Sequence, residues 1–256
     1  MKVGVVGLGL IGGSIFKALR DNTEGKYQVV GVSSSVKEEN VSNDYNTLKD
    51  CDLVFVCSPM SATLEVLDRL EDILSSNAIV TDVCSLKGFV SKKNYGYKFI
   101  PSHPMAGTEN NGWESSFSEL FKGAKWAITP LNNELLEEQD VLESIIEDLG
   151  AIPIITTPEE HDRAVALISH MPMLIAQAMC KSIKGNKLAQ ILAASGFRDT
   201  TRLALSNTQM ANDMIEMNSL NIKEAIKLLN LSVDELLTEN YRSNIEEIKE
   251  FRRNLY

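Results

Sequence analysis

The feature that most constrains the fold is a glycine-rich turn between an apolar strand and a helix at the start of the chain. Residues 2–6 form a short apolar run, and residues 15–19 carry apolar side chains at helical spacing. Between them, Gly7, Gly9 and Gly12 follow the spacing Gly-x-Gly-x-x-Gly. In this context the pattern is typical of a dinucleotide-binding turn, whose backbone approaches a pyrophosphate at a helix N-terminus.

Strand-like and helical segments alternate from there to about residue 157. Apolar strand-like runs occur at 27–32, 52–57, 78–83, 99–101, 125–129 and 152–156, and helical patterns at 61–74, with Ser61 as the expected N-cap, and 134–149. This alternation predicts an α/β domain over residues 1–157, with a Rossmann-type, mostly parallel sheet and helices on both faces.

The remaining residues, 158–256, contain no clear strand and predict an all-helical domain. A long helical region at 162–184 includes Pro172, which should kink it. Apolar faces on this region, and on a stripe from Ile245 to Leu255, are interpreted as the interface of a homodimer.

Composition excludes several classes of function. The 256 residues suit two domains, and a net charge of −10 argues against a nucleic-acid partner. The four cysteines form no Cys-x-x-Cys pair, so we expect no metal site and a reducing, cytoplasmic location. No signal peptide is recognised, and no apolar run reaches the ~20 residues that span a bilayer, so we expect no membrane contact.

His103 is the best candidate for a catalytic base. Of the three histidines, it alone stands in a loop bounded by proline and glycine directly after a short apolar strand. Its unperturbed pKa of ~6.5 would allow it to accept a proton near neutral pH, although a polar residue that caps the strand would look the same. Ser58, Ser85 and His103 each follow a predicted strand, so they could converge at one edge of the sheet.

Several ordered motifs extend this interpretation. They lie at residues 7–14, 82–87, 102–109, 161–162, 169–172 and 196–202. With these motifs the chain resembles the prephenate/arogenate dehydrogenase family of tyrosine biosynthesis over most of its length. The resemblance implies a dinucleotide domain, a helical dimerisation domain, and oxidative decarboxylation of prephenate to 4-hydroxyphenylpyruvate with hydride transfer to NAD(P)⁺.

The resemblance also implies roles for individual residues. His103 matches the catalytic histidine, Ser85 the serine that orients it near the nicotinamide, and Arg202 a clamp for the substrate carboxylate. Ser169, His170 and Thr108 match the substrate side, although from the residues alone His170 resembles a core histidine and His161 a local hydrogen-bonding group. The expected cofactor contacts are Gly7, Gly9, Leu10, Ile11, Gly12, Ser33, Ser34, Ser35, Ser58 and Pro59.

Two departures from the family pattern bear on specificity. The second strand ends in serines 33–35 instead of the acidic residue that holds an adenosine ribose, and Lys37 is near, so NADP is favoured over NAD. The short stretch between Ser33 and Asp50 also leaves little room for a helix plus a strand. Met173 stands where many members carry histidine, which favours acceptance of arogenate beside prephenate.

Other functions stay open at this point. The enzyme could be an arogenate dehydrogenase that forms tyrosine. A hydroxyacid dehydrogenase of the 6-phosphogluconate type would need a Lys-x-x-Asn pattern, which occurs at Lys227 and Asn230 but late in the chain. That alternative leaves His103 and Arg202 unexplained. A non-catalytic nucleotide sensor would bind the cofactor without turnover.

Overall fold

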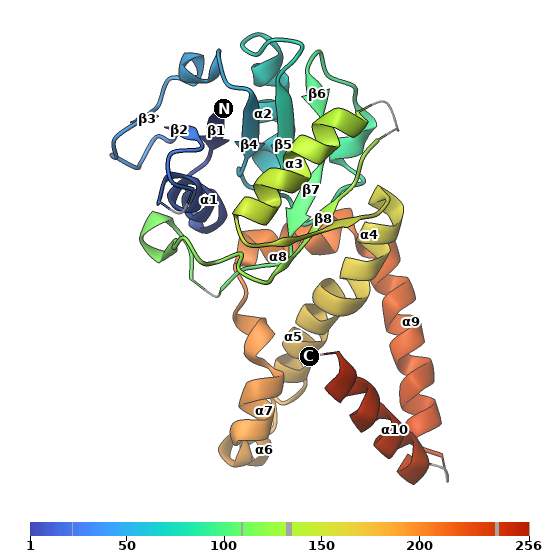
Figure 1. Ribbon diagram of the computed structural model, residues 1–256. Coiled ribbons are helices and arrows are strands. Elements are labelled where there is room, and N and C mark those ends of the chain that lie inside the picture. The colour runs from blue at the N-terminus through green and yellow to red at the C-terminus, as the bar shows by residue number, and fades with distance from the viewer. Residues whose placement is uncertain (22, 109, 132–134, 239–240, 256) are drawn as a thin grey trace.

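The computed structural model describes residues 1–21, 23–108, 110–131, 135–238 and 241–255, in an α/β half followed by a helical half (Figure 1). Six parallel strands form the main sheet in the order β3-β2-β1-β4-β5-β6. Because the order reverses between β1 and β4, this is the doubly wound Rossmann arrangement, and the predicted fold class is confirmed. The strands are β1 Lys2–Val6, β2 Gln28–Val32, β3 Val41–Ser42, β4 Leu53–Val56, β5 Ile79–Asp82 and β6 Lys98–Phe99.

Helices cover both faces of this sheet, as the near-continuous apolar strands require. Side chains of α1 (Leu10–Asp21) and α3 (Leu136–Asp148) share one core cluster with Leu53 and Phe55, whereas α2 (Met60–Glu71) shares another with Val54 and Val56. Successive side chains of β4 therefore point to opposite faces of the sheet and pack into the two core clusters in turn. Pro59 occupies the N-cap position of α2, so the expected cap at Ser61 is wrong. The expected start of α3 at Glu134 lies outside the described residues.

The segment between β2 and β4 is abbreviated, as its length predicted. Residues 33–52, all of which the structure describes, contain no α-helix; they hold only the two-residue strand β3 and a 3-10 turn at Tyr45–Leu48. The chain therefore crosses from β3 to β4 as a short turn, whose Leu48 side chain packs into the second core cluster.

A second, three-stranded sheet carries His103. Strand β7 (Ser102–Pro104) pairs antiparallel with β8 (Lys125–Ile128), which pairs parallel with β9 (Ile152–Ile155). His103 lies opposite Ala127 in this ladder. The expectation that His103 stands in a loop is therefore wrong. Of the strand expected at 99–101 only Phe99 lies in a strand, β6, and residues 102–104 form a separate strand because they pair with β8.

The helical half contains no strand within residues 158–238 and 241–255, as predicted. The kink expected at Pro172 takes the form of a π-helical turn at Ala166–His170, which lies between two α-helices. This turn accommodates the backbone N–H that proline lacks. The elements are α4 Pro158–Val165, α5 Met171–Ser182, α6 Lys187–Leu192, α7 Ser195–Thr200, a 3-10 turn Arg202–Leu205, α8 Thr208–Met217, α9 Ser219–Leu236 and α10 Tyr241–Asn254.

An apolar cluster joins the two halves behind the carboxyl edge of the sheet. Met60, Cys84 and Leu86 from the α/β half pack against helical residues that include Met173 and Met214. Met173 is only 3% exposed in this cluster. The Met173 side chain therefore packs in the core. This position gives no support to the expectation that Met173 favours acceptance of arogenate.

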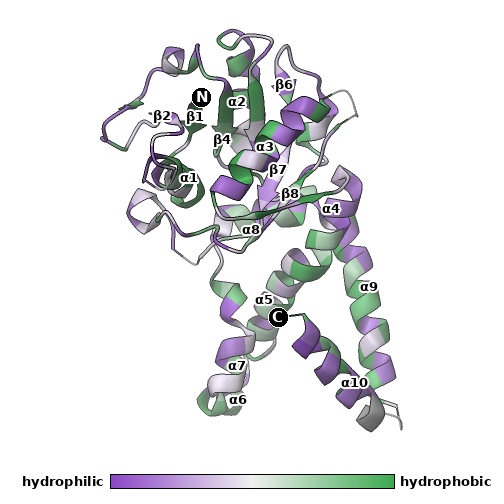
Figure 2. Ribbon diagram, in the orientation of Figure 1, coloured by the Kyte–Doolittle hydropathy of each residue, from purple (hydrophilic) through white to green (hydrophobic). Residues whose placement is uncertain are grey.

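Much of the helical half leaves large apolar side chains uncovered. Helices α6 and α7 bury no residue, and Leu205 and Leu237 are 82% and 81% exposed; Figure 2 shows apolar stretches along α5, α6 and α9. Contrary to the sequence expectation, the continuous helix 158–182 is long and apolar enough to cross a membrane by length and composition alone. A single helix of this kind is weak evidence, because the core helix of a soluble protein meets the same criterion.

Candidate active site

A cavity of about 1010 Å³ lies at the carboxyl edge of the main sheet, where the strand order reverses. This is where open α/β sheets bind their ligands. Of the predicted catalytic and substrate residues, Ser85, His103 and Thr108 line the cavity, whereas Ser169, His170 and Arg202 do not. The predicted cofactor contacts that line it are Gly7, Gly9, Leu10, Ile11, Ser33, Ser34, Ser35, Ser58 and Pro59; Gly12 lies behind them.

The glycine turn has the geometry that a bound pyrophosphate requires. Gly7 adopts φ +86°, a conformation that favours glycine, and the turn leads directly into α1. A Cβ at Gly9 would meet nothing within 4 Å, so the backbone there faces open space. A Cβ at Gly12 would lie 2.0 Å from the Gly7 carbonyl oxygen, so only glycine permits this packing. The residues therefore fit a dinucleotide at the N-terminus of α1.

The imidazole of His103 begins a chain of hydrogen-bonding groups that runs into the helical half. His103 Nδ1 lies 3.0 Å from His161 Nε2, and His161 Nδ1 lies 2.8 Å from Asp162 Oδ1. The Asp162 carboxylate also accepts the backbone N–H groups of Lys87 at 2.8 Å and Gly88 at 2.9 Å. His161 and Asp162 lie on α4, which places His161 beside His103 of β7.

This series of hydrogen bonds fixes which nitrogen of each imidazole ring carries the proton. A carboxylate accepts only, so His161 donates from Nδ1 to Asp162 and keeps a lone pair on Nε2. His103 then donates from Nδ1 to His161, which leaves a lone pair on His103 Nε2. The His103 side chain is partly exposed to the cavity that it lines, so this nitrogen is available as a base.

Electrostatics keep the same ring neutral. Burial lowers the pKa of His103 well below its usual range, and His161, Lys87 and His170 lower it further. Burial alone would raise the pKa of Asp162, but the hydrogen bonds from His161, Lys87 and Gly88 hold it below its usual range. The site therefore combines a neutral base with an ionised orienting carboxylate at neutral pH.

A buried ion pair fixes the backbone behind His103. The ammonium of Lys87 is fully buried, contacts the Asp82 carboxylate, and donates a hydrogen bond of 2.6 Å to the Ser102 carbonyl oxygen. Because the Lys87 backbone also binds Asp162, this one residue links β5, β7 and α4. The relative positions of His103 and His161 are set by this junction.

The predicted substrate residues of the helical half are divided between the core and the surface. His170 is completely buried, and its Nδ1 lies 3.1 Å from the amide nitrogen of Asn218, which also binds the Asp162 carbonyl oxygen. Burial lowers the pKa of His170 to about 4. Its Nε2 has no partner within the described part of the chain. Arg202 is exposed at the start of a 3-10 turn.

Two groups of site residues were not predicted as such. His161 was expected to act locally and Asp162 was named only within a motif, and nothing in the sequence indicates that His161 would reach His103, 58 residues earlier. Helix α8 supplies Gln209, Met210 and Asp213 to the cavity wall, and its N-cap residue Asn207 also lines it. The four are irregularly placed polar and apolar residues, without a recognisable motif.

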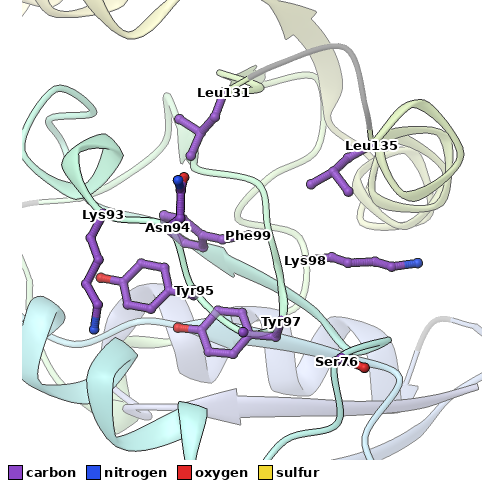
Figure 3. A pocket seen from close by; sticks show the side chains of 10 residues that line it. Ser76, Lys93, Asn94, Tyr95, Tyr97, Lys98, Phe99, Leu131 and Leu135 are labelled. Carbon is purple, nitrogen blue, oxygen red and sulfur yellow. The ribbon is translucent and has the colours of Figure 1, made fainter.

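A second cavity of about 310 Å³ lies apart from these residues (Figure 3). Its lining includes Ser76, which precedes β5, and Lys98, which begins β6, so it lies at the amino edge of the sheet. It contains none of the predicted site residues. No group of three or more His, Cys, Asp or Glu side chains is arranged to hold a metal ion anywhere in the described ranges.

Comparison with known proteins places this geometry in a family. Residues 18–155 match the family model described as prephenate dehydrogenase, nucleotide-binding domain, and residues 157–255 the model described as prephenate dehydrogenase, dimerization domain. A prephenate dehydrogenase of Bacillus subtilis is 29% identical over 84% of this chain, which spans 63% of the length of that relative.

Solved structures agree over the whole chain. An arogenate dehydrogenase of Synechocystis is 31% identical with a TM-score of 0.80, covering 99% of this chain and 97% of the other. A prephenate dehydrogenase of A. aeolicus, in complex with hydroxyphenyl propionate and NAD⁺, is 28% identical with a TM-score of 0.82, covering 100% and 96%.

Proposed function

The chain belongs to the prephenate dehydrogenase family, and from this premise we propose that it oxidatively decarboxylates prephenate, or arogenate, with NAD(P)⁺ as hydride acceptor. The observation that carries the proposal is the free Nε2 lone pair of His103 in the cavity that the glycine turn also lines. A base beside a dinucleotide site is what oxidation of a ring alcohol requires.

The reaction then follows from the groups present. When bound, NAD(P)⁺ supplies the acceptor for the hydride that leaves the ring carbon bearing the hydroxyl. His103 Nε2 takes the hydroxyl proton as that hydride departs. The carboxylate on the opposite ring carbon leaves as carbon dioxide, its bonding electrons complete the aromatic ring, and the phenolic oxygen recovers the proton from His103. His161 stabilises the imidazolium, because its Nε2 accepts from His103 and its Nδ1 is held by Asp162.

We assign the remaining roles in the same proposal. Ser85 orients His103 near the nicotinamide, and Thr108 lines the substrate end of the cavity. Ser169, His170 and Arg202 are assigned to the substrate side of the helical half, where the Nε2–H of His170 has no protein acceptor among the described residues. We further propose a cytoplasmic homodimer, with the nucleotide domain at residues 1–157 and the helical domain at 158–256.

Turnover tests the function directly. Dialysed protein is mixed with prephenate or arogenate and with NAD⁺ or NADP⁺, and the nicotinamide absorbance is followed. Formation of reduced cofactor with either substrate supports the proposal. Cofactor binding without turnover would indicate a sensor, and turnover only with an open-chain hydroxyacid would indicate the 6-phosphogluconate-type enzyme.

Arg202→Lys is expected to raise the KM for the substrate strongly and to leave cofactor affinity unchanged. Lysine keeps the charge but loses the paired N–H donors that bind a carboxylate. The native guanidinium is exposed and makes no ion pair with a described carboxylate, so the substitution leaves no buried group unpaired. A loss of cofactor affinity with an unchanged substrate KM would place Arg202 in the nucleotide site instead.

The protein is expected to sediment as a dimer at micromolar concentration. Its exposed apolar side chains on α6, α9 and α10 exceed what a monomer normally leaves in water. Analytical ultracentrifugation over a dilution series measures this state. A stable and fully active monomer would contradict the assignment.

We propose that the protein prefers NADP to NAD as its cofactor. The hydroxyl of Ser33 accepts the backbone N–H groups of Ser35 and Val36 at 3.3 and 3.2 Å, so its own proton is free to donate to a phosphate. Ser33→Asp should shift the ratio of kcat/KM towards NAD⁺, because a carboxylate binds ribose hydroxyls and repels a 2′-phosphate. A native enzyme with a clearly higher kcat/KM for NAD⁺ would overturn this preference.

A further inference from the structure

One cation stands in the wall of the cofactor cavity at the end where the serines 33–35 lie. Arg69, in the last turn of α2, places its guanidinium carbon 3.9 Å from the centroid of the Tyr45 ring. Both residues line the cavity together with Asn43. Tyr45 is half-buried by the second core cluster, so the ring is a fixed support for a long, otherwise exposed side chain.

This stacked pair is tied to the end of β2. The backbone N–H of Ser33 donates to the carbonyl oxygen of Ser42 at 2.9 Å, and Tyr45 follows Ser42 by three residues. The abbreviated turn after β3 thereby carries the ring from the serines across to α2. Lys37, the cation that the sequence placed near this region, does not line the cavity.

The guanidinium of Arg69 makes no ion pair with a carboxylate of the described residues. The acidic neighbours of Arg69 on α2, Asp68 and Glu71, both pair with Lys93, at 2.7 and 2.8 Å. Glu38 lies near Arg20 instead. Among the described residues that line the cavity, and apart from the titratable His103, only Arg69 and, from α8, Asp213 carry a full charge. Within the described part of the chain, Arg69 is therefore the one cation in the wall of the cavity that the serines also line, and it makes no ion pair there.

We propose that Arg69, held over Tyr45, binds the 2′-phosphate of the adenosine ribose and sets the preference for NADP, an inference that rests on the proposed function. A guanidinium is planar, so one face can lie on the tyrosine ring while its N–H edge pairs with phosphate oxygens. The three serines then supply hydroxyl donors on the other side. This places the discriminating cation on α2 and not on the loop that follows β2.

Calorimetry with nucleotide fragments tests the assignment without turnover. The probes are 2′,5′-ADP and 5′-AMP, which differ by the phosphate in question and lack nicotinamide. Arg69→Ala should weaken 2′,5′-ADP binding on the order of 10- to 100-fold, the range for a lost hydrogen-bonded charge, and change 5′-AMP binding by less than about threefold. The matched control Lys37→Ala removes an exposed cation outside the cavity and should change neither value.

The stacked ring is tested in the same assay. Tyr45→Phe keeps the ring and should retain the phosphate preference, whereas Tyr45→Leu should lose part of it. Equal losses for both fragments in Arg69→Ala would show that Arg69 only supports the adenine and would overturn the inference. So would native protein that binds 2′,5′-ADP no more tightly than 5′-AMP; turnover with NAD⁺ would then leave the proposed function standing.

Discussion

Replacing His103 by asparagine is expected to lower kcat by roughly 10²- to 10⁴-fold, the usual contribution of a positioned base. The asparagine amide can still donate to His161 Nε2, so the neighbouring hydrogen bond survives while the free lone pair disappears. Folding and cofactor affinity should be close to native. Steady-state kinetics with circular dichroism as the check on folding measures this, and turnover within tenfold of native would contradict the role of His103 as the base.

The native pH profile provides the second half of this test. The rate requires neutral His103, so it is full above the pKa of that ring and lost as the pH falls through it. Because burial lowers the pKa of His103 well below 6.5, the acid limb of kcat/KM should lie below that of an ordinary histidine. The decrease of kcat/KM at acid pH should be absent in His103→Asn. A native acid limb at or above pH 6.5 would contradict the lowered pKa of His103.

Asp162→Asn is expected to lower kcat by about 10²-fold or more, although Asp162 does not face the cavity. If the amide nitrogen faces His161, that ring must move its proton to Nε2, and His103 in turn loses the lone pair on its own Nε2. Either orientation also sets the amide nitrogen against a backbone N–H, that of Lys87 when it faces His161 and that of Gly88 when it is reversed, at a cost of about 1–3 kcal/mol of stability. Stopped-flow kinetics separates the two orientations, because only the first removes the lone pair of His103, and thermal unfolding measures the stability cost that both share.

The control for this variant is Asp68→Asn, which removes an exposed carboxylate that pairs with Lys93 on the surface of α2. It should leave both kcat and the acid limb unchanged. Cofactor affinity should also stay near native in Asp162→Asn, because the glycine turn lies on other elements. An Asp162→Asn enzyme with native kcat and a native pH profile would show that the chain from His103 to Asp162 has no part in catalysis.

The fold was largely predictable because its signals are local. The glycine spacing and the apolar runs of β1, β4 and β5 each lie within a few consecutive residues, and the pattern of alternation then restricts the order of strands. The predictions failed where a partner elsewhere in the chain decides the outcome. Residues 102–104 became a strand because β8 pairs with them.

The sequence by itself determined the dinucleotide fold, the helical second half and the choice of His103 as the candidate base, because short-range patterns and ordered motifs encode these. Only the tertiary structure decided how that base is held. His161 meets His103 across 58 residues, Lys87 is buried at the junction of three elements, and Arg69 of α2 stacks on Tyr45 in the wall of the cavity. These contacts join elements from different parts of the chain, and their geometry depends on packing that no local pattern records.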